Sequence, residues 1–460
     1  MDALMLIVSV ALPWVAGAAW LRFLPKSPPL PWATAIGYGH FIGVLAVTSV
    51  LRLYSAAGIK WNFAAVACAL LVFAAIPVWR ARARWREALA KPDLAEDWAL
   101  LGRRTRIVLV AIGVVLVARF AGLLLEIVWR PLFPWDAWMQ WATKARVWFD
   151  LGYMAPFAPY DAWATGDPAR IFTDPAPGYP ATVPLLQVWS CIALGRWDDA
   201  LMNVPWFACG VALGFAFWAQ VRAWGAPPTL AAAATYLLLT VPFVDTHIAL
   251  AGYAELHLAA TYGLAAMAFF LWARDGDARQ GWLALVLAAA LPFIKRPGIF
   301  WLASFIPAYL VMLKSRLTLV AMGVAATAGL IVAFVLRSTG IRIFNYALTA
   351  DVNAGEVTSA LAQNLFEMGN WNLFFWYLPL MALVAWRGLL RGPLAPITTM
   401  IAFGTYFLGI VFYFSIAGDW VSDFSTVNRA VFHMVPLAAF WLVALVLARF
   451  YSPPEPPRLV

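Results

Sequence analysis

Charged residues are scarce in this sequence. They make up 12% of its 460 residues, whereas 64% of the residues are hydrophobic and the mean hydropathy is +0.78. In an ordinary soluble domain, roughly a quarter of the residues are charged. The composition therefore excludes a soluble globular protein and predicts a protein that crosses the membrane several times.

Cysteine is scarcer still. The three cysteines, Cys68, Cys191 and Cys209, lie in apolar surroundings and have no CxxC spacing. Neither a disulfide framework nor a cysteine-based zinc motif follows from them. The net charge of +9 does not indicate nucleic-acid binding, because the basic residues lie mainly in short loops between apolar runs. That distribution is the positive-inside pattern of membrane proteins.

Long apolar runs are abundant, and most approach the length that crosses a bilayer. They predict an all-α polytopic membrane protein with about 13 transmembrane helices, since roughly 20 residues span a ~30 Å hydrocarbon core. The first run is expected to be a retained helix, because no small-residue cleavage site follows it. The runs are residues 4–22, 34–52, 62–79, 106–127, 202–221, 229–246, 253–273, 280–294, 298–313, 317–336, 371–387, 394–416 and 430–449.

The most basic loop lies between the third and fourth runs and is expected to be cytoplasmic. Residues 1–105 are then three additional helices and this loop, residues 106–450 form the membrane core, and residues 451–460 are a short, disordered, proline-rich tail. Counting back and forward puts the N-terminus and the polar loop 128–200 outside, and the C-terminus inside. The basic residues expected inside include Arg22, Lys26, Arg80, Arg82, Arg84, Arg86, Lys91, Arg103, Arg104 and Arg106.

The apolar segment 181–195 is too short to span comfortably, and it opens with Pro180 and Pro184. If it lies flat on the outer surface as an amphipathic helix, Arg222 falls inside. The later basic loops then fall inside as well. We therefore expect a juxtamembrane helix here, like the one expected over 135–150. The later basic residues that this topology places inside are Arg274, Arg279, Lys314, Arg316, Arg387, Arg391 and Arg449.

Asp136 follows the fourth span in the motif PWDAW, in the large outer loop. A carboxylate there can act as a general base toward a hydroxyl nucleophile. Trp135 and Trp138 could stack against a sugar or simply anchor a juxtamembrane helix at the interface. Lys144 falls on the same helix face as Asp136 and could bind a phosphate or reach toward the interface as an anchor.

Lys295 and Arg296 interrupt an apolar hairpin on the outer side, against the positive-inside trend. Two adjacent cations there favour an anionic partner such as a lipid phosphate, although ordinary phospholipid headgroups would also serve. Arg429 opens the last span and suits either a phosphate contact or a helix-end anchor.

Two further pairs of polar residues lie near outer span ends. Asp245 and His247 precede Glu255 and His257 by ten residues, and together they could build a divalent-metal site. The alternative is that these are ordinary polar residues at helix ends. The sequence therefore assigns no metal ligand, and whether the protein binds a divalent metal is left open.

Taken in order, these segments resemble the GT-C class of membrane glycosyltransferases, which includes the protein O-mannosyltransferases and the transferase that adds aminoarabinose to lipid A. The resemblance covers about residues 106–450. It rests on Asp136 early in the first large outer loop and on several loosely matching segments. These segments are WATKARVWFDLG, GYPATVPLLQVW, GYAELHLAA, LPFIKRPGIFWLA and NRAVFHMVPLAAF.

The resemblance implies a GT-C-like fold in the bacterial inner membrane, with its active site facing the periplasm. The donor would be a polyprenyl-phosphate-linked sugar, and the acceptor a glycan, lipid or protein hydroxyl, with no nucleotide cofactor and no nucleic acid. Asp136 would be the general base, and Glu255 would orient the sugar or acceptor. The donor phosphate would be bound by Lys295, Arg296, Arg429 and Lys144, and the candidates for substrate contact are Trp135, Trp138, Tyr179 and His257.

Two other functions remain open on the sequence. A secondary transporter or flippase of a lipid-linked or anionic substrate would place ionisable groups at the bilayer midplane and often show internal repeats. The acids and bases gather instead near the outer surface. A non-catalytic assembly subunit is the second alternative.

Overall fold

The structure is a computed structural model that describes residues 2–23, 28–90, 98–167, 170–343 and 346–451. Lys26, Lys91 and the predicted disordered tail from residue 452 onward lie outside the described residues. The regular secondary structure of the described chain is helical apart from two short strands, in which β1 (Arg342–Ile343) pairs antiparallel with β2 (Tyr346–Ala347).

Among the described residues, eight helices are long and apolar enough to cross a membrane. They confirm the prediction of an all-α, multi-pass membrane protein. They are α1 (Asp2–Arg22), α2 (Trp32–Ala56), α3 (Phe63–Arg80), α6 (Arg103–Trp129), α10 (Val204–Ala223, with a preceding 3₁₀ turn), α13 (Glu255–Asp275), α17 (Arg316–Leu336) and α20 (Leu394–Phe414).

Two more predicted spans are each broken into a pair of helices. α11 (Pro228–Leu239) meets α12 (Pro242–Ala249) at 59°, and α21 (Thr426–Phe432) meets α22 (Val435–Phe450) at 53°. Pro242 and Pro436 lie in the first turn of the second helix of each pair, where proline starts a new helix rather than continuing the old one. Counting each pair as one span gives up to ten.

The three remaining predicted spans correspond to shorter apolar helices. They are α14 (Ala278–Ile294), the run of α15 (Gly298–Ala303) into α16 (Phe305–Met312), and α19 (Phe374–Val384). The count of thirteen spans therefore stays a prediction.

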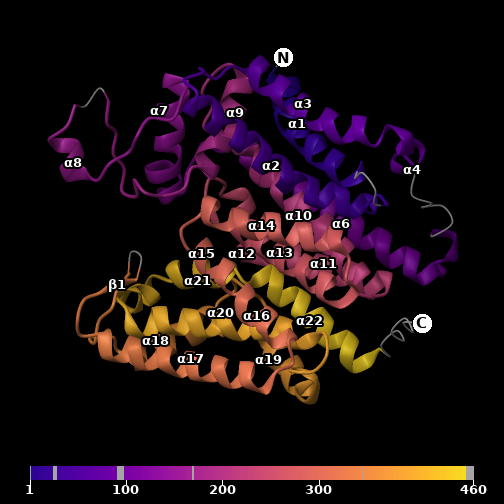
Figure 1. Ribbon diagram of the computed structural model, residues 1–460, viewed down its shortest axis with the longest axis vertical. Coiled ribbons are helices and arrows are strands. Elements are labelled where there is room, and N and C mark those ends of the chain that lie inside the picture. The colour runs from indigo at the N-terminus through magenta and orange to yellow at the C-terminus, as the bar shows by residue number, and fades with distance from the viewer. Residues whose placement is uncertain (1, 24–27, 91–97, 168–169, 344–345, 452–460) are drawn as a thin grey trace.

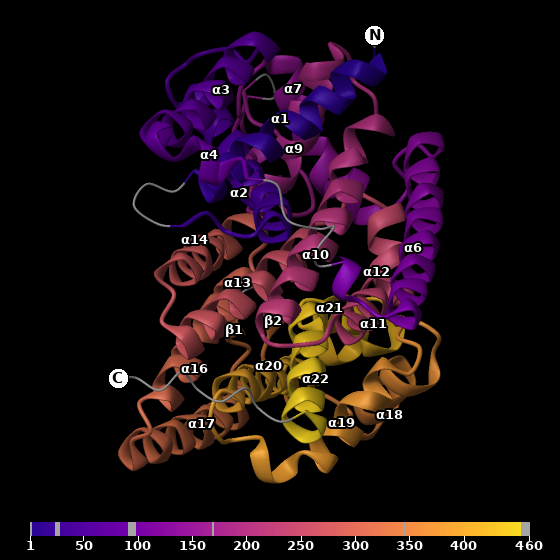
Figure 2. The same cartoon turned by 90° about the vertical axis from the view of Figure 1, so that its right-hand side faces the viewer.

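The helices form a connected series from the N-terminus to the C-terminus (Figures 1 and 2). α1 packs on α2, α2 on α10, α10 on α13, and α13 on both α14 and α22. α13 is central, since 89% of its apolar stretch is buried, whereas α6 and α17 bury 11% and 6% of theirs. A helix that is apolar all round and buried belongs in the interior, and one that is apolar and exposed here faces lipid.

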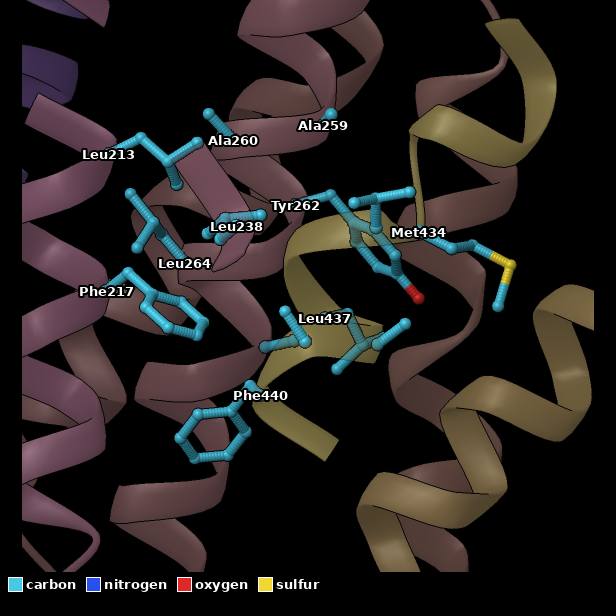
Figure 3. Close-up of a cluster of buried hydrophobic side chains, with 14 of the residues drawn as sticks. Leu213, Phe217, Leu238, Ala259, Ala260, Tyr262, Leu264, Met434, Leu437 and Phe440 are labelled. Atoms are coloured by element: carbon cyan, nitrogen blue, oxygen red, sulfur yellow. The ribbon is translucent and has the colours of Figure 1, made fainter. Parts of the chain in front are cut away.

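Small residues allow close packing around α13. A Cβ on Gly263 would come within 2.6 Å of the Pro436 side chain, so this glycine lets α22 approach the α13 backbone. Figure 3 shows the apolar cluster that α10, α11, α13 and α22 build around this contact. Its labelled members are Leu213, Phe217, Leu238, Ala259, Ala260, Tyr262, Leu264, Met434, Leu437 and Phe440.

Contacts between loops agree with the predicted alternation of the spans. Arg22 at the end of α1 donates from Nε to the Ala88 carbonyl at 3.0 Å, and Arg279 at the start of α14 donates to the Pro28 carbonyl at 2.7 Å. These loops were all predicted to lie inside, and they meet at one end of the helices.

The predicted outer segments meet at the opposite end. Arg196, at the end of the large polar loop, forms an ion pair of 3.0 Å with Asp2 at the start of α1. In Figure 1, the loop helices α7 (Thr143–Leu151) and α8 (Tyr160–Ala164) lie with β1 on the left, opposite α4 (Trp85–Ala88). Which of these ends faces the cytoplasm stays a prediction.

The expectation of an amphipathic surface helix at 181–195 is wrong. This segment forms α9 (Thr182–Leu194), in which Ile192 and Leu194 are half-buried and every other residue is buried. It packs against α1, α2, α3, α7 and α14. The cause is the loop 128–200, whose helix α7 covers α9, so that no face is left for water or headgroups.

Candidate functional site

A polar cavity of about 470 Å³ lies where α15, α20 and α21 meet the large loop. Its wall comes from six stretches of the chain that are far apart in sequence. The lining residues are Trp135, Asp136, Tyr179, Tyr253, Lys295, Arg296, Pro297, Phe300, Trp301, Phe407, Leu408, Val411, Trp420, Asp423, Ser425, Thr426, Arg429, Ala430 and His433.

Glu255 is the anchor of the charged groups, although it lies behind the cavity wall. It is the first residue of α13 and is fully buried. Its Oε1 accepts a hydrogen bond from Lys295 Nζ at 2.6 Å and another from Arg429 Nε at 2.5 Å. A buried carboxylate is stable only when paired in this way. Glu255 thus fixes both cations. It does not line the cavity, so the predicted role of orienting sugar or acceptor would have to act through these cations and stays a prediction.

Arg429 is the group that joins two carboxylates. While its Nε binds Glu255, its Nη1 lies 2.6 Å from Oδ2 of Asp136, and its guanidinium lies 4.7 Å from the centre of the Tyr253 ring. Guanidinium favours such bidentate and ring-face contacts because it is planar. These contacts hold one face of Arg429 against the protein.

The short helix α21 positions Arg429, and polar side chains hold its start and its third residue, Asn428. Asp423 accepts hydrogen bonds from the backbone N–H groups of Ser425 and Thr426 at 2.7 and 2.8 Å, which caps the helix start. Asn428 accepts a hydrogen bond from Trp371 Nε1 at 2.8 Å, which ties the helix to the loop before α19. Arg429 is therefore preorganised by its own element.

Lys295 lies in the sharp reversal between α14 and α15. Its backbone is extended, and a Cβ on Gly298 would overlap the Leu291 carbonyl, so the glycine permits the tight turn. Burial of the ammonium group lowers the pKa of Lys295, and the neighbouring Glu255 carboxylate opposes that effect. The expected helix junction bearing two cations is this turn, and its location on the outer side stays a prediction.

Arg296 belongs to the same turn and reaches the large loop. Its Nε donates to the Gly178 carbonyl at 3.1 Å, and its guanidinium lies 5.6 Å from the centre of the Tyr179 ring. A Cβ on Gly178 would overlap the guanidinium, so this glycine is the residue that admits it. Arg296 and Tyr179 both line the cavity.

Asp136 is the accessible carboxylate of the cluster. Its side chain is 22% exposed and lies on the cavity wall, just before a π-helical turn that leads into α7. Trp135 lines the cavity beside Asp136. Trp138 packs edge-on against Trp135, with 5.1 Å between ring centres, and is not among the residues that line the cavity.

Lys144 is not among the residues that line the cavity. It is buried, forms an ion pair with Asp174, and donates to the Ala176 carbonyl at 2.8 Å. Burial lowers the pKa of Lys144, and Asp174 opposes that shift. This pair ties the loop segment 174–176 to α7, so the predicted role of Lys144 in phosphate binding does not fit its position.

His257 does not line the cavity either. It follows Glu255 by two residues on α13, and residues two apart on a helix lie on nearly opposite faces. Glu255 points to the cations and His257 toward α10, where its ring meets Trp206. The predicted metal grouping is not assembled among the described residues. Asp245 forms an ion pair with Arg119, and His247 Nδ1 lies 2.9 Å from a backbone carbonyl.

Several cavity residues were missed from the sequence. Tyr253 precedes Glu255 by two residues. His433 follows Arg429 by four residues, and a spacing of four places two residues on the same face of a helix. Trp301 donates from Nε1 to His433 Nδ1 at 3.2 Å and lines the cavity with it. Helical spacing from Arg429 could have pointed to His433.

The arrangement presents three cations and an accessible carboxylate around one cavity, with aromatic side chains beside them. Such a site can bind a phosphate and accept a proton from a bound hydroxyl group. Comparisons of the chain with family models, curated protein sequences and solved structures find no match.

Proposed function

We propose that this protein is a GT-C-type membrane glycosyltransferase. It moves a sugar from a polyprenyl-phosphate donor to a hydroxyl acceptor on the periplasmic face of the inner membrane. The observation that carries the proposal is the Asp136–Arg429–Glu255–Lys295 chain of ion pairs, which places an accessible carboxylate and paired cations in one cavity.

The cations are suited to the donor phosphate. Lys295, Arg296 and Arg429 line the same cavity, and Lys and Arg both bind phosphate through charge-assisted hydrogen bonds. A guanidinium offers five N–H donors, more than the Glu255 and Asp136 contacts of Arg429 use. Glu255 acts as a positioning residue that holds two of these cations before substrate arrives, which reduces reorganisation during the reaction.

Asp136 would serve as the general base. Its carboxylate accepts the proton of the acceptor hydroxyl while that oxygen forms a bond to the anomeric carbon. The bond from the anomeric carbon to the phosphate oxygen breaks, and the oxygen leaves with the electron pair as polyprenyl phosphate. The donor phosphate competes with Asp136 for Arg429, so donor binding would release the carboxylate for proton transfer.

An apolar groove of about 800 Å³ provides a place for the donor's lipid tail. It lies between α14 and α16, beside α15. Ile299 and Leu302 of α15 line this groove, whereas Phe300 and Trp301 line the polar cavity. A donor could therefore place its tail and its phosphate on the two sides of one short helix that begins next to Lys295 and Arg296.

The test is transfer by the purified protein in detergent or vesicles, using polyprenyl-phosphate sugars and a panel of hydroxyl acceptors. Labelled sugar is expected on an acceptor in the wild-type sample and far less of it in Asp136→Asn, while both bind the donor. Vesicles that move the donor across the bilayer without any transfer would favour a transporter. Neither transfer, donor binding nor flux would favour an assembly subunit.

A further inference from the structure

A second cluster of reactive side chains lies on the other side of α13 from Glu255. His40 of α2, Cys209 of α10 and His257 of α13 each offer one ligand atom, and these atoms lie within 4.8 Å of one another. The three residues are 4%, 0% and 1% exposed. Because α10 packs directly on both α2 and α13, the cluster is enclosed at a junction of three helices.

Three of the four imidazole nitrogens of His40 and His257 are buried and have no hydrogen-bond partner in the described part of the chain. His40 Nε2 and both ring nitrogens of His257 are buried without a hydrogen bond to any described residue. Buried polar atoms are normally satisfied, so unsatisfied nitrogens on two neighbouring imidazoles indicate a bound group that one nitrogen of each ring would ligate. The cluster therefore has the composition and the unsatisfied atoms of a metal site.

Aromatic contacts hold both rings without using their nitrogens. Trp206 meets His257 edge to face at 4.9 Å between ring centres, and Trp14 meets His40 in the same way at 5.1 Å. Trp206 is fixed in turn by a hydrogen bond from Nε1 to the Tyr253 carbonyl at 2.7 Å. The imidazoles are thus oriented before any ligand arrives, as supporting contacts orient ligands in metal sites.

We propose that His40, Cys209 and His257 bind one monovalent copper ion. On binding, the Cys209 thiol releases its proton and the thiolate sulfur bonds to Cu(I), while each neutral imidazole donates a lone pair. Copper stays in the same oxidation state, so no oxidant or reductant is required. Thiolate and imidazole are ligands that copper and zinc both accept.

Charge decides between these two metals. One thiolate, two neutral imidazoles and a monovalent ion sum to zero, whereas a divalent ion leaves one uncompensated positive charge. Outside the cluster, the ring neighbours of His40 are Trp14 and Phe41, and that of His257 is Trp206. The three helices that carry the cluster are long and apolar enough to cross a membrane. An uncompensated charge is costly to bury in such surroundings. The neutral Cu(I) complex is therefore preferred over Zn²⁺.

The test uses the full-length protein in detergent, titrated anaerobically with Cu(I) against a chromogenic Cu(I) chelator. We expect one copper per chain, and copper-edge X-ray absorption with one sulfur and two nitrogen scatterers. The double variant Cys68→Ala/Cys191→Ala keeps Cys209 as its sole thiol and should load copper as the wild type does. Cys209→Ala and His257→Phe should each load at least tenfold less.

The double variant keeps the test decisive even if Cys209→Ala fails to fold. Loss of copper loading, or of the sulfur scatterer, in Cys68→Ala/Cys191→Ala would overturn the assignment. Stoichiometric Zn²⁺ loading combined with no Cu(I) loading by the wild type would overturn the preference for a monovalent ion. Copper should also raise the unfolding temperature of the double variant, since a ligand that binds the native state stabilises it.

Discussion

The guanidinium of Arg429 lies 2.6 Å from the carboxylate of Asp136. The two residues are far apart in the sequence, since Asp136 follows the fourth predicted span and Arg429 opens the last one. Through Nε, the same guanidinium binds Glu255 at 2.5 Å. The first and last parts of the predicted membrane core are therefore held together at one end by one side chain, and the cavity forms at that point.

Asp136→Asn should strongly slow sugar transfer while leaving donor binding intact. The amide keeps the size and hydrogen-bonding ability of the side chain but cannot accept the proton, and loss of a general base typically lowers the rate by about 10²–10⁴-fold. Initial rates and donor affinity measured on the same preparation check this. Trp138→Phe, a change next to the cavity, is the control and should retain transfer. Normal transfer by Asp136→Asn would place the base elsewhere.

Arg296→Ala should weaken donor binding and turnover together without unfolding the protein. Arg296 lines the cavity at its loop side, and a phosphate contact exists in both the bound and the transition state. Donor titration and transfer rates measure the two effects. The matched control is Arg146→Ala, which removes a surface arginine paired with Asp150. Equal donor affinity in both variants would remove Arg296 from the donor site.

Glu255→Gln should destabilise the protein because it leaves Lys295 and Arg429 without their shared buried partner. Breaking a buried ion pair from one side costs about 3–5 kcal/mol. Combining it with Lys295→Met should recover part of the loss, and the double-mutant cycle should give a coupling of roughly 0.5–3 kcal/mol. Thermal unfolding in detergent measures each variant. Strict additivity would show that the 2.6 Å contact contributes nothing.

Lys144→Met should lower stability and leave the donor affinity of the folded protein unchanged. It removes the partner of buried Asp174, which is not among the residues that line the cavity. Adding Asp174→Asn should restore much of the stability, because replacing both partners is far less costly than removing one. A loss of donor affinity in folded Lys144→Met would instead support the phosphate role that the sequence suggested.

Labelling of single cysteines should place residue 90 and α8 on opposite sides of the membrane. Ala90→Cys lies in the basic loop and Tyr160→Cys in the large loop, both in a background that lacks the exposed Cys68. An impermeant thiol reagent applied to intact cells should label position 160 and not position 90. Labelling at position 90 alone would reverse the orientation and put the cavity on the cytoplasmic face.

The sequence was enough to predict the membrane class and the positions of the long apolar helices. Apolar runs of span length and loop arginines suffice for that, because the bilayer requires local backbone hydrogen bonding and the basic loops follow the positive-inside pattern. It also pointed to Asp136, Lys295 and Arg429, since a charge beside an apolar run is conspicuous. None of these inferences needs a long-range contact.

Tertiary structure alone decided which charges meet. Lys144 and Lys295 look equally suited to phosphate in the sequence, yet Asp174 pairs with the first and Glu255 with the second. The surface helix predicted over 181–195 became a buried α9 because α7 covers it. Partner choice and burial depend on helices brought together from distant parts of the chain, and the local pattern of residues does not encode which helices those are.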